Sequence, residues 1–186
     1  MAKATGKKRY AQYVSELAVP IPPGMLDMRH IATCDADILP SSPYHIEVIT
    51  WTGTGSAYVP GKKPPKLTKG NKHIPGLIYN AFGQEPEGMY PMYHTYDEAF
   101  VFFGTNPKDP LDLGGEIEFW LGAGEHAEKW VINRSTYVYV PAGLVHCPMD
   151  CVKFERPFIE FVMVPNPVHI EHHINLWPPG YKALVK

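Results

Sequence analysis

The chain has 186 residues, of which 45% are hydrophobic and 12% aromatic, which suits one globular domain and excludes disorder along the whole chain. Its 17 basic and 19 acidic residues leave a formal net charge of −2, so no overall positive field would recruit nucleic acid or an anionic membrane. The 20 prolines and 16 glycines favour a β protein with many short elements, because proline is confined to turns and strand edges.

Local sequence excludes two further classes. No stretch approaches the roughly 20 apolar residues of a membrane helix, and the N-terminal segment lacks the apolar core of a secretion signal. We therefore expect a soluble, cytoplasmic protein with neither a membrane nor a nucleic acid as partner. The three cysteines Cys34, Cys147 and Cys151 are an odd number, and we expect them to be reduced.

Residues 1–76 are interpreted as an extension that packs on the main domain. Apolar residues at helical spacing predict a short helix over Lys8–Leu17. Alternation over Tyr44–Trp51 predicts a strand. Its two faces carry Tyr44, Ile46 and Val48 on one side, and His45, Glu47, Ile49 and Trp51 on the other. Five lysines between Lys62 and Lys72 follow in a glycine- and proline-rich connection, which is either a solvated loop or an anion-binding lid over a pocket.

Residues 77–165 are predicted to form the main β domain, and residues 166–186 a C-terminal tail. Short runs rich in β-branched and aromatic residues follow one another, separated by turn sequences such as NPKDPLDLGG. This spacing is typical of a sandwich or barrel. The tail contains His169, His172 and His173, which are interpreted as surface residues because no carboxylate or cysteine ligand accompanies them.

Two groups of residues within the β domain could do chemistry. In the first, Met92, His94, Glu98, Phe100 and Phe102 would share one face if an extended segment runs through them. In the second, the strand ending at Tyr139 is closed by a Pro141 to Gly143 turn that presents His146. Together they offer His94, Glu98 and His146, a set suited to a divalent transition metal with coordination positions left open for substrate.

These residues resemble the two motifs of the cupin superfamily, G(X)5HXH(X)3,4E(X)6G and G(X)5PXG(X)2H(X)3N. In the second motif Pro141, Gly143 and His146 are in register, while Ser135 and Asp150 replace its glycine and asparagine. In the first, His94 and Glu98 match the second histidine and the glutamate, and Gly104 comes one residue early. Met92 stands in place of the first histidine. An alternative register with His94 first and Tyr96 second leaves too little room before Glu98.

The resemblance implies an all-β fold, an antiparallel jelly-roll β-barrel, here with a short N-terminal helix and extension. It also implies an ion such as Fe, Mn, Ni or Zn inside the barrel, held by His94, Glu98 and His146, with Met92, Phe100 and Phe102 as pocket lining. Glu118, Tyr137, Tyr139 and Glu160 are further pocket candidates, although a position that faces solvent is favoured for each.

The leading functional interpretation is a metal-binding cupin that acts on a small carboxylate-bearing or aromatic molecule, as a dioxygenase, isomerase or lyase. The alternative is a non-catalytic cupin that serves as a small-molecule binder or an assembly scaffold. The residues identify no catalytic side chain and do not decide between the two interpretations. A homodimer is expected, because the apolar strand over Tyr44–Trp51 would otherwise leave an unpaired edge.

Overall fold

The structure is a computed structural model that describes residues 13, 16–17, 29–56, 77–80 and 91–184. The helix predicted over Lys8–Leu17 lies almost entirely outside the described residues, and the Lys62 to Lys72 connection lies wholly outside them. Within the described part of the chain, no helix has the length and apolar character to cross a membrane.

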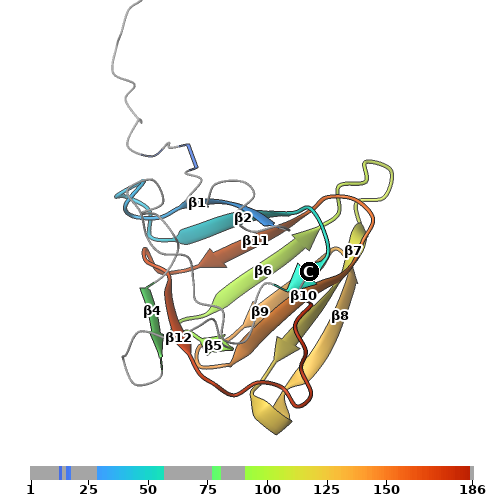
Figure 1. The fold of residues 1–186 in the computed structure, drawn as a ribbon. Helices are drawn as coiled ribbons and strands as arrows, with labels where there is room; N and C mark the ends of the chain where they lie inside the picture. Colours follow the sequence, from blue (N-terminus) through green and yellow to red (C-terminus); the bar gives the residue numbers. More distant parts are fainter. Residues whose placement is uncertain (1–12, 14–15, 18–28, 57–76, 81–90, 185–186) are drawn as a thin grey trace, which may run out of the picture.

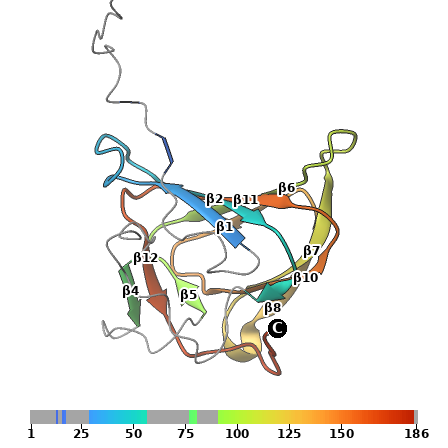
Figure 2. The same ribbon diagram turned by 45° about the horizontal axis from the view of Figure 1, so that its top comes forward.

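Two sheets face each other, and both are built from short strands (Figures 1 and 2). The first sheet contains five strands in the order β1-β2-β11-β6-β9, namely Arg29–Cys34, His45–Trp51, Phe158–Val164, Glu98–Phe103 and Thr136–Val140. The second has seven strands. Six follow the order β4-β12-β5-β10-β7-β8, namely Leu77–Asn80, Ile170–His173, Met92–Tyr93, His146–Phe154, Asp112–Leu121 and Glu128–Arg134, and β3 (Gly55–Ser56) also pairs with β10.

The strand order is that of a jelly roll. From β5 onward the chain passes repeatedly between the sheets, so that β6, β9 and β11 lie in the first sheet while β7, β8, β10 and β12 lie in the second. Apart from β1 with β2 and β7 with β8, neighbours in a sheet are therefore not consecutive in sequence, as two interlocked Greek keys require. All pairings are antiparallel except that of β12 with β4. The predicted all-β jelly-roll fold is confirmed by this order.

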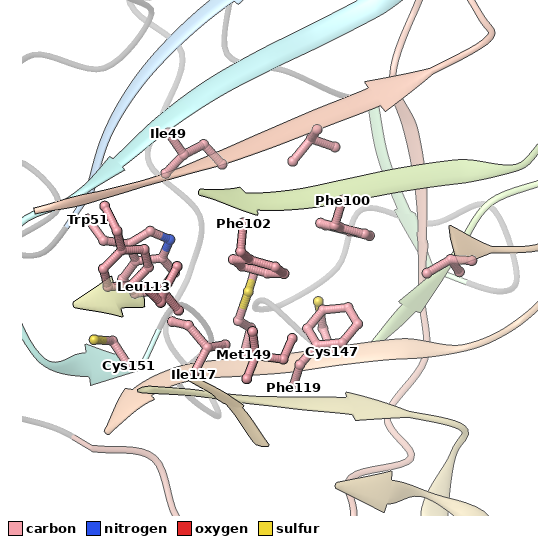
Figure 3. Close-up of a cluster of buried hydrophobic side chains, with 14 of the residues drawn as sticks. Ile49, Trp51, Phe100, Phe102, Leu113, Ile117, Phe119, Cys147, Met149 and Cys151 are labelled. Atoms are coloured by element: carbon pink, nitrogen blue, oxygen red, sulfur yellow. The ribbon is translucent and has the colours of Figure 1, made fainter. Parts of the chain in front are cut away.

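The core fills the space between the sheets with large apolar side chains (Figure 3). Phe100 of the first sheet lies 5.2 Å, between ring centroids, from Phe119 of the second. Trp51 and Phe158 stack within the same layer. Alternate residues of β6 and β11 are buried along the whole of each strand, the pattern expected when one sheet face meets the core and the other meets solvent. Cys34, Cys147 and Cys151 are buried and form no disulfide in the structure.

Strands on both sides of residues 77–165 take part in the sheets. β2 pairs with β11 along seven residue pairs, and β1 pairs with the other edge of β2. The buried face of β2 is the one that carries His45, Glu47, Ile49 and Trp51. Because both edges of β2 are covered, the unpaired edge that motivated the homodimer prediction does not occur at this strand. The homodimer itself stays a prediction.

Candidate metal centre

Three side chains from different elements converge on one point inside the barrel. His94 follows β5, Glu98 begins β6 and His146 begins β10. Glu98 Oε2 lies 3.2 Å from His94 Nε2 and 3.0 Å from His146 Nε2. All three side chains are buried. Ligand atoms about 2.1 Å from one ion are about 3.0 Å apart at a right angle, so these separations suit joint coordination.

The chain reaches this arrangement by crossing between the sheets at residues 95–97. The predicted continuous extended segment from Met92 to Phe102 is therefore divided into β5 in the second sheet and β6 in the first. A backbone hydrogen bond joins this crossing segment to the turn of the second motif, because Gly143 N donates to His94 O at 2.8 Å. Gly143 has a φ of 82°, in the left-handed region that only glycine enters without cost. The two motifs thus meet through their turns as well as through their side chains.

Both imidazole rings are oriented by backbone carbonyls. His94 Nδ1 lies 2.6 Å from Ile170 O, and His146 Nδ1 lies 3.2 Å from Leu144 O. A carbonyl oxygen only accepts hydrogen bonds, so each Nδ1 carries a hydrogen, and in the neutral ring Nε2 then keeps its lone pair. This is the tautomer that a metal ligand needs, with the outer nitrogen held by a supporting partner.

The convergent atoms are left without hydrogen-bond partners. His94 Nε2 and Glu98 Oε2 are both buried, and neither makes a hydrogen bond, although the two atoms lie 3.2 Å apart. Buried polar atoms are seldom left in this way. A cation would compensate the surplus of acceptors at this point, and the donor set of two imidazoles and a carboxylate is one that Fe, Mn or Zn accepts. The residues present therefore fit a divalent transition metal.

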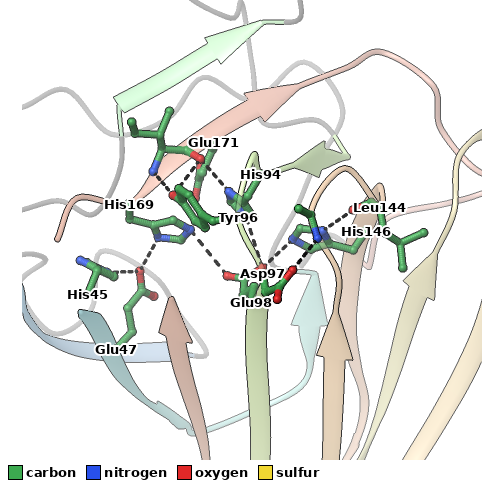
Figure 4. Close-up of polar contacts among 12 residues, drawn as sticks. His45, Glu47, His94, Tyr96, Asp97, Glu98, Leu144, His146, His169 and Glu171 are labelled. Carbon is green, nitrogen blue, oxygen red and sulfur yellow. Dashed lines mark hydrogen bonds and ion pairs between the residues drawn. The ribbon is translucent and has the colours of Figure 1, made fainter. Parts of the chain in front are cut away.

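A second cluster lies beside the first and contains His45, Glu47 and His169 (Figure 4). Glu47 Oε1 lies 3.1 Å from His45 Nε2 and 3.2 Å from His169 Nδ1. Burial would raise the pKa of Glu47, but hydrogen bonds from the two imidazoles outweigh it and lower that pKa to about 2. Burial works against the charged form of His169, yet the bond to Glu47 and nearby carboxylates raise its pKa to about 9.

The C-terminal histidines are not the surface group that the sequence predicts. His169 and His173 are 5% and 1% exposed. His172 stacks on Tyr93 at 4.9 Å between centroids. The reason is tertiary: residues 170–173 form β12, a strand of the second sheet that pairs with β5. This pairing carries His169 to the same end of the barrel as the predicted ligands.

A cavity of about 40 Å³ opens beside the convergent atoms. Polar and apolar groups share its wall, which comprises Arg29, Glu47, Ile49, Met92, Glu98, Phe100, His146, Met149, Glu160, Val162, His169 and Glu171. Glu160 is 1% exposed and accepts a hydrogen bond from Trp51 Nε1 at 2.7 Å. Burial raises the pKa of Glu160 to about 7, although the positive charge of Arg29 acts in the opposite direction.

The predicted pocket residues divide into two groups. Met92, Phe100 and Glu160 line the cavity, whereas Phe102 is fully buried in the core. Tyr137 and Tyr139 are 59% and 50% exposed on β9 and so lie outside it. Glu118 pairs with Lys129 at 2.7 Å, also away from the cavity. Glu118, Tyr137 and Tyr139 lie outside the cavity for the same reason. Side chains alternate between the two faces of a strand, and the apolar residues next to these three, such as Ile117 and Phe119, take the inward positions.

Sequence reasoning missed Arg29, His45, Glu47, His169 and Glu171. One pattern could have found two of them, because His45 and Glu47 share a strand face with Ile49 and Trp51. Polar residues on the apolar face of a strand are candidates for a buried site. Arg29 and His169 had no such local pattern. Tyr96, the residue of the alternative register, bonds through its hydroxyl to the backbone of Ile170 instead.

A comparison of the sequence with models of protein families finds no match, and a search of curated proteins finds none either. A search of solved structures finds distant likenesses. An oxalate oxidase is 11% identical with a TM-score of 0.49, over 94% of this chain and 67% of that one. The oxalate decarboxylase of Bacillus subtilis, which has Mn(II) centres, is 9% identical with a TM-score of 0.48, over 83% of this chain and 30% of that one.

An oxalate decarboxylase of Lactobacillus farciminis in complex with formate is 11% identical with a TM-score of 0.46, over 83% of this chain and 33% of that one. The chain thus spans about a third of the length of the decarboxylases that it matches. The assignment of the fold rests on the strand order described above.

Proposed function

We propose that this protein is a metal-dependent enzyme of the cupin type that acts on a small carboxylate-bearing molecule. The observation that carries the proposal is the convergence of His94, Glu98 and His146, with buried atoms that lack partners, on the wall of a cavity. A divalent ion bound there would supply a Lewis acid with open coordination positions. Fe, Mn, Ni and Zn are all compatible with the donor set.

The size of the cavity limits the substrate. A water molecule needs roughly 10–15 Å³ measured in this way, so the cavity of about 40 Å³ holds a group of only a few heavy atoms. An aromatic substrate would not fit within it. This favours the carboxylate-bearing alternative over the aromatic one, with the apolar wall of Met92, Phe100 and Val162 excluding water from the bound molecule.

Arg29 is the residue that we assign to the substrate carboxylate. Its guanidinium lies 5.5 Å from the centre of the Trp51 ring, and its buried Nε has no hydrogen-bond partner. A guanidinium has a planar set of donors that matches a carboxylate. Arg29 also lines the cavity that Glu98 and His146 line, so a short substrate could reach both Arg29 and the metal centre.

Glu160 is the residue that we assign to proton transfer. Its raised pKa of about 7 places both protonation states within reach at neutral pH, which is what a general acid or base requires. Trp51 Nε1 holds one carboxylate oxygen, which fixes the orientation of the group. Glu160 would therefore hold or release a proton at the end of the cavity that Arg29 also lines.

The test uses metal-loaded protein and a panel of mono- and dicarboxylates of two to four carbons. We expect at least one member to raise the melting temperature, because a ligand that binds only the folded state stabilises it, and to be converted to a product seen by NMR. Arg29→Gln should abolish the shift without loss of metal, while the control Arg134→Gln on exposed β8 should change neither. A bound ligand recovered unchanged would favour a non-catalytic binder. Protein that takes up no metal would refute the proposal.

A further inference from the structure

We propose that His169 is a fourth protein ligand of the ion held by His94, Glu98 and His146. The inference rests on the metal centre proposed above and deepens it. It assigns the coordination of that ion to a residue that lies outside both sequence motifs, in the segment that leads into β12.

The Glu98 carboxylate is surrounded by three imidazoles. Its Oε2 atom faces His94 and His146, and its Oε1 atom lies 3.6 Å from His169 Nε2 (Figure 4). The His169 and His94 rings are 4.8 Å apart between centroids. Two ligands about 2.1 Å from one ion are about 3.6 Å apart at an angle of 120°, so the separation of Glu98 Oε1 and His169 Nε2 is one that a shared ion allows.

The free nitrogen of His169 is the one that faces the site. His169 Nε2 is buried and has no hydrogen-bond partner, and the same is true of His94 Nε2. Its other nitrogen, Nδ1, donates to Glu47 Oε1 at 3.2 Å. Each of the three imidazoles thus has Nδ1 held by an acceptor and Nε2 directed at Glu98, which is the arrangement of a histidine ligand supported by a carboxylate or a carbonyl.

The backbone beside His169 is fixed to the metal centre. The Tyr96 hydroxyl accepts a hydrogen bond from Ile170 N at 2.5 Å, and Ile170 O accepts from His94 Nδ1 at 2.6 Å. The Tyr96 ring stacks on His94 with an angle of 9° between planes. The segment that follows the barrel is therefore part of the construction of the site, and the position of His169 is set by residues of the first motif.

The same geometry accounts for Met92. Met92 is 2% exposed, lines the cavity and lies directly across from His146 in the strand pairing. Its thioether is a poor partner for an ion held by imidazole and carboxylate. A third imidazole is nevertheless available, because His169 approaches Glu98 from the β12 side.

The competing possibility is a second ion bound by His45, Glu47 and His169. There the nitrogen atoms of both histidines lie within hydrogen-bond distance of the same Glu47 oxygen, so these groups already satisfy one another. The atom of His169 that lacks a partner is Nε2, on the other side of the ring. Glu47 is thus better understood as the support that orients His169.

The experiment uses full-length protein stripped with a chelator and loaded with Zn(II). X-ray absorption spectroscopy counts imidazole ligands, elemental analysis gives the number of ions per chain, and competition with a chromophoric chelator gives the affinity. The variants are His169→Ala and Glu47→Gln. The matched control is His172→Ala, which removes an imidazole from the same segment, because the His172 ring stacks on Tyr93. Circular dichroism reports whether each variant is folded.

We expect one ion and three imidazoles in the parent protein and in His172→Ala, and two imidazoles in His169→Ala. Loss of an outer supporting residue lowers metal affinity about 10–100-fold, so Glu47→Gln should fall in that range and His169→Ala should exceed it. Two imidazoles in the parent protein would overturn the inference and leave the three-residue centre intact. A second ion lost in Glu47→Gln would also overturn it. Absence of zinc from the parent protein would refute the centre itself. If His169→Ala does not fold, the count in the parent protein decides.

Discussion

Glu160 gives the protein a dependence of stability on pH that one substitution should remove. Burial raises its pKa from 4.5 to about 7 in the folded state, so the folded protein binds the proton more tightly than the unfolded chain. The stabilising contribution is complete below pH 4.5 and is lost as the pH rises through 7. A pKa of about 7 in place of 4.5 corresponds to roughly 3 kcal/mol, most of which falls between pH 5 and pH 8.

The substitution Glu160→Gln keeps an amide oxygen for the hydrogen bond from Trp51 Nε1 but cannot ionise. The assay is urea unfolding of metal-free protein at pH 5, 6, 7 and 8, from which the free energy of unfolding is extrapolated. We expect the difference in this free energy, variant minus parent, to grow by roughly 2–3 kcal/mol from pH 5 to pH 8. Comparison with the parent protein cancels the contributions of Glu47 and His169, which both proteins share.

The control is Glu118→Gln, which removes a carboxylate paired with Lys129 outside the cavity. Its unfolding curve should run parallel to that of the parent protein across the same pH range. Parallel curves for Glu160→Gln as well would refute the reasoning, because they would mean that Glu160 titrates alike in the folded and unfolded states.

Four further predictions concern the candidate metal centre, the turn at Gly143 and the oligomeric state. His146→Ala should remove most of the bound metal, measured by elemental analysis, while circular dichroism remains that of the parent protein because the core does not depend on the ion; unchanged metal content would contradict it. Met92→His should restore zinc affinity to a His169→Ala background, since position 92 lies opposite His146, and no gain would mean that this position does not face the ion. Gly143→Ala should cost about 1–2 kcal/mol because a φ of 82° is unfavourable for a side chain, lowering the melting temperature by roughly 2–8 °C; an unchanged melting temperature would contradict this. Sedimentation at micromolar concentration should give the mass of a homodimer, and a monomer mass would exclude it.

Local sequence determined the class of the fold and most of the candidate metal centre. Period-two alternation and turn residues identify strands because each strand buries one face, a requirement that acts residue by residue along the chain. His94, Glu98 and His146 were identifiable because they lie in short motifs whose turns, such as the one at Gly143, are themselves encoded locally.

Tertiary structure decided which distant segments complete the site. Glu47 reaches the cavity, with His45 beside it, because β2 pairs with β11, more than 100 residues away in sequence. His169 reaches Glu98 because β12 joins the second sheet beside β5. Long-range strand pairing depends on the combined burial of both partners. The alternation within one strand shows that it is a strand but does not identify the strand with which it pairs. For the same reason the inward or outward direction of Tyr137 and Tyr139 was set by the sheet that β9 joined, and the sequence of that strand permitted both.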